Sequence, residues 1–294
     1  MKFKTTEDHI IDVTIHVLVA LFAAVCLYPL VYCVSMSFSG DNAILLREVV
    51  FLPVGFNLES YKMVLSESKF WTSLWNSVFY TAVGATWQVL WTFLLGYVTS
   101  RNHFVFKKFL DVYVLIPMFF GGGLIPTYLM MRAIGLYNNI GAIIIPGAIS
   151  IWNSILVKSF IRTNVPNELV ESALIDGAND MQILTKIVVP LSTTIIAIIF
   201  MYAAMGIWND YFQALIYLEN EALHPLQLYL KSVMDVGAGE LANSSGTANA
   251  VQIAIEKTRI RYVLVVVVAL PVALLYPVIQ KYFVKGVTLG SIKG

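Results

Sequence analysis

The sequence predicts an all-α polytopic membrane protein with six transmembrane helices. Of its 294 residues, 58% are hydrophobic and 13% are charged, and the mean hydropathy is +0.76. Soluble domains are about 45–50% apolar and about 25% charged, so this composition is typical of a chain partly solvated by hydrocarbon. Six segments each hold the roughly 20 mostly apolar residues that a spanning helix needs. These segments are 10–36, 72–99, 107–131, 137–161, 187–217 and 259–284.

The first segment is expected to be a retained helix rather than a signal peptide, because it is too long and no small-residue cleavage site follows it. In the loop after it, NLESYKMVL predicts a short surface helix. The boundaries along the chain are then 1–9 for a cytoplasmic N-terminus, 10–36 for the first helix, 37–71 for an outer loop, 72–284 for a core of five helices and 285–294 for a cytoplasmic tail.

The core is interrupted by two polar loops. An inner loop covers residues 162–189, and a second outer loop covers residues 218–257. Within the outer loop, the stretch from Asp235 to Val251 is rich in Gly, Ala, Ser and Asn, so it should be mobile and exposed.

The distribution of basic residues favours a cytoplasmic N-terminus, since positive charge is enriched on the cytoplasmic side of membrane proteins. With that orientation, eleven basic residues lie inside and eight lie outside, the latter spread over longer loops. Arg259 and Arg261 oppose this topology, because they flank a span on the outer side. An even number of spans then places the C-terminus in the cytoplasm as well.

Charge and motifs exclude several functions. A net charge of +1 gives no reason to expect binding to nucleic acid. The four histidines are scattered without metal-ligand spacing, and no Ser-His-Asp or Cys-His pairing stands out. The sequence has no G-x-x-x-x-G-K-[ST] stretch, so it lacks a phosphate-binding loop. We therefore expect no catalysis by this chain and no cofactor or metal of its own.

The inner polar loop contains ELVESALIDGANDMQILTKIVVP, a pattern that predicts two short helices separated by a glycine. Pro166 suits the first turn of a helix, and the carboxylates of Glu168 and Glu171 suit its positive N-terminal end. Gly177 is expected to end this helix, because glycine adopts positive φ freely. Asn179 or Asp180 can cap the second helix.

Each of the two helices is amphipathic. The apolar residues of the first face are Leu169, Val170, Ala173 and Leu174, and those of the second are Leu184, Ile187 and Val188. Two interpretations follow from the pattern: a connector that floats at the membrane surface, or a knob that fits a groove on a soluble partner. The pattern alone leaves both open.

The stretch ESALIDGANDMQILTKIVVP resembles the EAA loop of binding-protein-dependent ABC importer permeases. Ser172 departs from the alanine usual in that motif. The positions that match are Glu171, Ala173, Asp176, Gly177, Ala178 and Pro190. Further resemblance to MalG-like carbohydrate permeases is carried by GGGLIPTYLMMRAIGLYNN, WNDYF, PLQLYL and QKYFVKGVTLGSIKG, so it extends over almost the whole chain.

The resemblance implies a MetI/MalG-like type I ABC importer permease fold in a bacterial cytoplasmic membrane. It implies a heterodimer with a second homologous permease, two ATPase subunits that hold ATP and Mg, and an extracytoplasmic sugar-binding protein. The coupling loop would seat on an ATPase subunit through Glu168, Glu171, Ala173, Asp176, Gly177 and Ala178. ATPase closure would then tilt the attached helices and open the path alternately to each side.

The expected substrate path centres on WNDYF. A charge within the membrane is costly, about 2.5–3.5 kcal/mol at a helix centre, so Asp210 draws attention. Sugars are bound by aromatic faces combined with hydrogen-bonding groups. The candidates are Trp208, Asn209, Asp210 and Tyr211, with Tyr202 and Asn153 as further positions. The alternative for each is packing against a neighbouring helix or the partner permease.

Two other functions remain as alternatives. An ion-coupled secondary transporter would show carboxylates near the bilayer midplane and inverted repeats, and neither is evident. A membrane scaffold without transport would not need the EAA-like loop.

Under the importer interpretation, the outer loop around 238–248 is expected to reach into the binding protein, and the tail from Lys285 to Gly294 is expected to touch the ATPases.

Overall fold

A computed structural model describes residues 6–101, 106–243 and 257–274, and every described element of regular structure is helical. The helices are distributed over two compact units. Unit 1 comprises residues 1–68 and 230–270, and unit 2 comprises residues 69–229 and 271–294. Our expectations for residues 1–5, for residues 244–256 of the outer loop and for the tail 285–294 lie outside the described residues.

Unit 1 contains a long apolar helix and a small folded cap. Its elements are α1 (Thr6–Ser37), α2 (Asp41–Leu45), α3 (Glu59–Ser66), most of α14 (Leu226–Asn243) and a helix at 257–270 that continues to residue 274. Apolar side chains along α1 are exposed until Tyr32, where the helix meets the core formed by Met36, Ala43 and Val49. The helix predicted in NLESYKMVL is confirmed as α3.

A buried ion pair joins two segments of unit 1 that are distant in sequence. The guanidinium of Arg259 is 2.9 Å from the carboxylate of Asp41, and the Arg259 side chain is only 4% exposed. A second carboxylate, on Glu59, is 3.9 Å away. A buried arginine is tolerated when carboxylates neutralise it, so these contacts tie the start of the last helix to α2 and α3.

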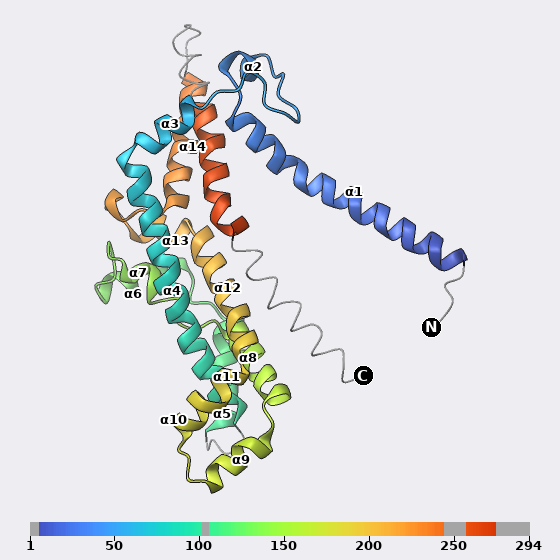
Figure 1. The fold of residues 1–294 in the computed structure, drawn as a ribbon. Coiled ribbons are helices and arrows are strands. Elements are labelled where there is room, and N and C mark those ends of the chain that lie inside the picture. Colours follow the sequence, from blue (N-terminus) through green and yellow to red (C-terminus); the bar gives the residue numbers. More distant parts are fainter. Residues whose placement is uncertain (1–5, 102–105, 244–256, 275–294) are drawn as a thin grey trace. The chain divides into compact units, whose positions relative to one another are not determined.

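Unit 2 is built along α4 (Ser68–Ser100), which is about 50 Å long at 1.5 Å per residue. The other helices pack along it or follow it in the chain (Figure 1). They are α5 (Lys107–Phe119), α6 (Leu124–Ala133), α7 (Gly141–Ile144), α8 (Ile151–Asn164), α9 (Asn167–Ile175), α10 (Asp180–Ile183), α11 (Val189–Leu191), α12 (Thr193–Asn209) and α13 (Phe212–Tyr217). A π-helical turn, η1 (Leu184–Val188), and a 3-10 turn, η2 (Glu221–Leu223), complete the unit.

The N-terminal half of α4 holds the loop that follows α13. The Lys69 ammonium is 2.7 Å from the Glu221 carboxylate, and it lowers the pKa of that carboxyl through its hydrogen bond and its charge. The Asn76 amide donates to the carbonyl of Ala222, and the Tyr80 hydroxyl donates to that of Leu223. These contacts fix the 3-10 turn η2 against the helix.

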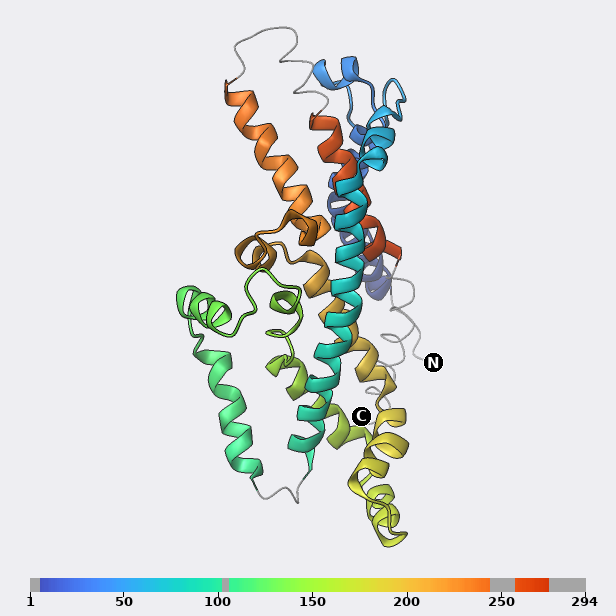
Figure 2. The same ribbon diagram turned by 90° about the vertical axis from the view of Figure 1, so that its left-hand side faces the viewer.

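The C-terminal half of α4 packs into the main core of unit 2. Phe93 and Tyr97 contact a buried cluster that includes Val157 of α8, Ile183 of α10 and Ile199 of α12. Both views place α9 and α10 together at this end of the unit (Figures 1 and 2). The two halves of α4 therefore contact different parts of the unit: η2 at the N-terminal half and the core next to α9 and α10 at the C-terminal half.

Two helices in the described part of the chain, His9–Ser37 and Ser68–Ser100, are long and apolar enough to cross a membrane by themselves. Two bent pairs also qualify if each pair counts as one span. The first pair, α5 with α6, is bent by 113°, and the second, Asp180–Leu191 with α12, is bent by 80°.

Three predicted segments are therefore not single helices. The segment 107–131 breaks at Gly121–Gly123, where Gly123 has φ of +80°. The segment 137–161 contains only the short α7 before Ile151, because Pro146 and Gly147 occupy a turn. The segment 187–217 breaks at Ser192 and again between α12 and α13. Glycine and proline end helices by freeing φ and by removing a donor.

The second outer loop also differs from the prediction in part. Residues Leu226–Asn243 form the helix α14, although the stretch from Asp235 was expected to be an exposed mobile loop. Leu226, Leu228 and Leu230 are buried and anchor its start, and Lys231 forms an ion pair with Asp235 one turn further along. A helix that is already nucleated extends at little cost, even through residues of low helix propensity.

Candidate functional site

The polar loop after α8 folds into a helix, a sharp turn and a second helix, as predicted. Val165 ends α8, and Pro166 precedes α9 at the N-cap position rather than within its first turn. Helix α9 ends at Ile175, and Gly177 follows with φ of +79°. A side chain at position 177 would meet no neighbouring atom, so the backbone conformation alone demands glycine.

The turn at Gly177 has the hydrogen bonds of a Schellman motif, in which two amides fold back onto carbonyls of the last helical turn. The Gly177 amide donates to the carbonyl of Leu174 at 3.1 Å, and the Ala178 amide donates to that of Ala173 at 2.9 Å. Ala173 and Ala178 both pack against the core of unit 2. Small residues at these two positions therefore let the turn lie close to its own helical body.

The second helix of the loop begins with a reciprocal cap. The side chain of Asn179 accepts from the Gln182 amide at 2.9 Å, and the Gln182 side chain accepts from the Asn179 amide at 2.9 Å. This is a capping box, and it confirms Asn179 rather than Asp180 as the cap. Pro190 has no N–H to donate to the Lys186 carbonyl, and the π-helical turn η1, which includes Lys186, ends two residues before it.

The apolar residues of α9 do not form one face. Val170 is buried in the core of unit 2 and Ala173 packs against it, whereas Leu169 and Leu174 are about half exposed. Ile175 is 87% exposed, which is extreme for an apolar side chain, and Met181 at the start of α10 is also exposed. The loop therefore buries one side in its own chain and presents a second apolar side outward.

The acidic residues of the loop lie on its exposed surface. Glu168, Glu171 and Asp176 are all exposed. Glu171 also lines a cavity of about 380 Å³ together with Arg101 and Arg162. The outward surface of the loop thus combines apolar side chains with carboxylates and a cavity edged by both signs of charge.

A second site lies midway along α4. A pocket of about 240 Å³ is lined by residues of α4, α8, α12, the segment before α8 and the start of α13. Its polar side chains are Gln88, Ser150, Asn153, Tyr202, Asp210 and Gln213, and its small residues include Gly84, Gly147 and Gly206. Asp210, the lone acidic residue in this lining, caps α13 by accepting from the amides of Phe212 and Gln213 at 2.9 and 3.1 Å.

Three of the residues predicted for the substrate path, Asn153, Tyr202 and Asp210, meet in this pocket although they come from different segments. Asn153 is buried, and Tyr202 is 45% exposed. Amide, phenol and carboxylate groups offer both donors and acceptors. The arrangement suits a ligand rich in hydroxyl groups.

The other three predicted path residues lie outside the lining of the pocket. Trp208 is 6% exposed, so its ring packs within the helices and presents little surface to a ligand. The Asn209 amide donates to the Met205 carbonyl and accepts from Gln227. Tyr211 is 40% exposed. The packing alternative fits the burial of Trp208.

Sequence reasoning missed two polar residues of this pocket, Gln88 and Gln213. Gln88 lies in the apolar stretch TAVGATWQVLWTF, and an amide at membrane depth is a signal that could have identified it. Gln213 gave no such signal, because only the break between α12 and α13 brings it beside Asp210.

A membrane-length helix, a polar pocket beside it and a capped helix pair near one of its ends are features of a membrane transport subunit. Residues 88–289 match the family described as "Binding-protein-dependent transport system inner membrane component". The chain belongs to this family, whose members are permease subunits of ABC importers.

Individual relatives agree with this assignment. The chain is 35% identical over 288 residues, covering 98% of it and all of the relative, to the polygalacturonan/rhamnogalacturonan transport system permease protein YtcP of Bacillus subtilis. It is 33% identical, with a TM-score of 0.84, to a chain in the crystal structure of a bacterial ABC transporter involved in import of the acidic polysaccharide alginate, covering 96% of this chain and all of that one.

A second solved structure is similar in fold alone. It is the bacterial alginate ABC transporter in complex with an alginate pentasaccharide-bound periplasmic protein. The match has 16% identity and a TM-score of 0.53, and it covers 90% of this chain and 92% of that one.

Proposed function

We propose that the chain is the permease subunit of an ATP-driven importer that carries an oligosaccharide across a bacterial cytoplasmic membrane. It spans the membrane six times with both termini in the cytoplasm, and a second permease completes the path. Two separate ATPase subunits bind and hydrolyse ATP with Mg, and this chain contributes neither nucleotide nor metal ligands. An extracytoplasmic binding protein delivers the sugar.

The observation that carries this proposal is the outward apolar side of the loop between α8 and η1. Ile175 is fixed in an exposed position by the Schellman turn that follows it, and the carboxylates of Glu171 and Asp176 in the same segment are also exposed. An ordered apolar knob in water is costly unless a partner covers it. The ATPase subunit is the partner that a permease of this family requires on its cytoplasmic side.

The pocket beside α4 supports the choice of substrate class. Its six polar side chains and its small residues suit hydroxyl-bearing rings. One relative named above is described as a polygalacturonan/rhamnogalacturonan transport permease, and another belongs to a transporter that imports the acidic polysaccharide alginate. Asn153, Tyr202, Asp210, Gln88 and Gln213 form this chain's contribution to the path.

Co-purification tests the loop assignment. The tagged chain, extracted gently from its native membrane, should bring down a second permease and a Walker-motif ATPase. Gly177→Ala should reduce the amount of co-purified ATPase at least fivefold. A non-glycine residue in the left-handed region costs about 1–2 kcal/mol, so the turn would shift. Glu171→Ala tests the carboxylate beside Arg101 and Arg162 in the same way.

The matched control is Gly177→Asn, since asparagine tolerates the left-handed conformation. The Gly177→Asn variant should bring down most of the ATPase that the original chain brings down. If Gly177→Ala and Glu171→Ala both keep the ATPase at the level of the original chain, or if the chain purifies alone, the proposed coupling role is wrong.

A further inference from the structure

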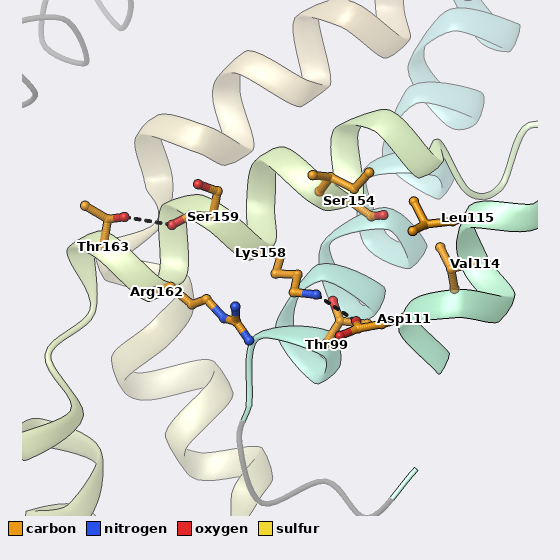
Figure 3. Close-up of a pocket in the computed structure, with 10 residues that line it drawn as sticks. Thr99, Asp111, Val114, Leu115, Ser154, Lys158, Ser159, Arg162 and Thr163 are labelled. Carbon is orange, nitrogen blue, oxygen red and sulfur yellow. Dashed lines mark hydrogen bonds and ion pairs between the residues drawn. The ribbon is translucent and has the colours of Figure 1, made fainter. Parts of the chain in front are cut away.

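A pocket distinct from the loop and from the polar pocket opens between α5 and α8, near the C-terminal end of α4. Its volume is about 490 Å³, within the range of about 300–1,000 Å³ that is common for small-molecule sites. Figure 3 shows its side chains converging from the three helices. No step of the proposed transport cycle uses it.

One wall of this pocket is apolar. Val114 and Leu115 of α5 face Ile155 of α8 across it. Helix α5 has no buried residue, so it packs loosely against the rest of unit 2. A space between helices at membrane depth that is lined by aliphatic side chains is filled most favourably by hydrocarbon.

The other wall is basic. Lys158 forms an ion pair with Asp111 at 2.7 Å, which links α8 to α5 (Figure 3). Arg162 lies one turn further along α8 and also lines the pocket. Lys107, outside the pocket lining, interacts electrostatically with all three of these charged groups. Among the lining side chains, two cations against one carboxylate leave a net positive charge at this wall.

A hydroxyl group supplements the cations. Ser159 lines the pocket beside Arg162 and Lys158. Thr99 and Thr163 also line it, but they donate their hydroxyl hydrogens to carbonyls of their own helices. Hydroxyl and guanidinium donors together bind phosphate oxygens well. Since Arg162 also borders the cavity next to Glu171, this charged wall lies at the loop's end of unit 2.

We propose that this pocket binds one anionic phospholipid of the cytoplasmic leaflet. Its phosphodiester lies against Arg162, Lys158 and the Ser159 hydroxyl, and an acyl chain lies along Val114, Leu115 and Ile155. Basic pockets between helices on the cytoplasmic side attract such headgroups, because that leaflet carries the anionic lipids. The inference takes from the proposed function only that the loop's end of unit 2 faces the cytoplasm.

A segment of the partner permease is the rival occupant. It would have to bring a carboxylate to neutralise the basic wall, and it would have to fit a space of 490 Å³. A helix with its side chains is about 10–12 Å wide, which the space accommodates poorly. The combination of aliphatic and basic walls matches the two ends of a phospholipid directly.

Native mass spectrometry of the delipidated importer complex, titrated with phosphatidylglycerol or phosphatidylcholine, tests the proposal. We expect saturable binding of phosphatidylglycerol and markedly weaker binding of phosphatidylcholine. Arg162→Gln should weaken the binding of phosphatidylglycerol about fivefold, which is the effect of one basic charge near an anionic headgroup. Lys108→Gln removes a charge near the start of α5, outside the pocket lining, and should change this binding less than twofold.

A second pair of variants tests occupancy rather than charge. Ser159→Phe fills the pocket and should abolish the saturable site, whereas Asn164→Phe adds the same ring to an exposed position of α8 and should not. Both variants are compared only after the complex is shown to assemble with its ATPase. Loss of the lipid site is therefore distinguished from loss of the complex.

Four outcomes would overturn the proposal. They are equal affinity for the two lipids, equal effects of Arg162→Gln and Lys108→Gln, full binding by Ser159→Phe, and displacement of the lipid by millimolar inorganic phosphate. Protection of a Ser159→Cys thiol in the lipid-free complex would also overturn it, because the partner permease would then occupy the pocket.

Discussion

Asp210 illustrates how one side chain can serve the fold and the path together. Its carboxylate accepts two amide hydrogens at the start of α13, and it also lines the polar pocket with Asn153 and Tyr202. A carboxylate at membrane depth is costly when it lacks partners. The amides of the broken helix supply those partners, so the break between α12 and α13 is what makes an acidic residue tolerable there.

Substitution of Asp210 separates the two roles. Asp210→Ala removes the cap, at a cost of about 0.5–2 kcal/mol, together with a charged acceptor for sugar hydroxyls, which is worth about 1.5–3 kcal/mol. We expect sugar uptake to fall at least tenfold. Asp210→Asn keeps an acceptor for the cap, so it should show an intermediate loss from the weaker hydrogen bond alone.

Uptake of radiolabelled sugar and basal ATPase activity of the assembled complex are the measurements. If Asp210→Ala left both rates unchanged, Asp210 would have no part in the path. Full activity of Asp210→Asn beside a defective Asp210→Ala would assign the residue to capping alone.

At the scale of elements, the sequence predicted best what local chemistry determines. The helix, glycine and helix of the loop followed from Gly177, Asn179 and the apolar spacing, and the capping box confirmed one of two candidate caps. Apolar composition located the long helices α1 and α4. These features depend on neighbours within a few residues, which a single sequence displays directly.

Hydropathy alone did not predict how the apolar segments are broken. Residues 137–161 are apolar throughout most of their length, and hydropathy alone cannot distinguish a continuous helix from a turn at Pro146 followed by α8. The pocket also depends on tertiary packing, since Gln88 and Gln213 are 125 positions apart. For the same reason, the apolar residues of α9 were predicted to form one face. Periodicity does not show which of these side chains the rest of the protein will bury.

The close packing of α4 against α8 gives a prediction at this scale. A Cβ added at Gly96 would lie 2.6 Å from side-chain atoms of Val157 and 2.9 Å from the Ser154 carbonyl oxygen. Gly96→Ala should therefore force the helices apart and destabilise the protein by about 1–3 kcal/mol, as overpacking does. Thermal unfolding of the purified chain in detergent measures the change.

Gly206→Ala is the matched control, since a Cβ at Gly206 meets no neighbouring atom. It should leave the melting temperature unchanged or raise it, because alanine favours helix. The double variant Gly96→Ala with Val157→Ala should recover part of the loss. Equal melting temperatures for Gly96→Ala and Gly206→Ala would contradict the packing argument.

For the whole molecule, the surface chemistry explains why the chain needs a membrane and partners. Large apolar side chains are exposed along α1, α5 and α6, which is tolerable in hydrocarbon or in an assembly but not in water. Arg259, one of the two basic residues that oppose the predicted topology, is buried against Asp41. This ion pair gives Arg259 a structural role that does not depend on the side of the membrane, and the remaining charge bias favours the predicted orientation.

This orientation makes a prediction for the intact chain. With Cys26 and Cys33 replaced by serine, a single cysteine is introduced either at Ser66 at the end of α3 or at Asn164 at the end of α8, both exposed positions. Because α3 belongs to the predicted outer loop, a membrane-impermeant maleimide should label Ser66→Cys in cells whose outer barrier is opened but whose cytoplasmic membrane is intact. Asn164→Cys should react only after that membrane is permeabilised, since α8 leads into the loop that we propose meets the ATPase. The opposite pattern would invert the topology and place the loop, its exposed Ile175 and the basic pocket beside Arg162 on the side where no ATP-driven partner can reach them.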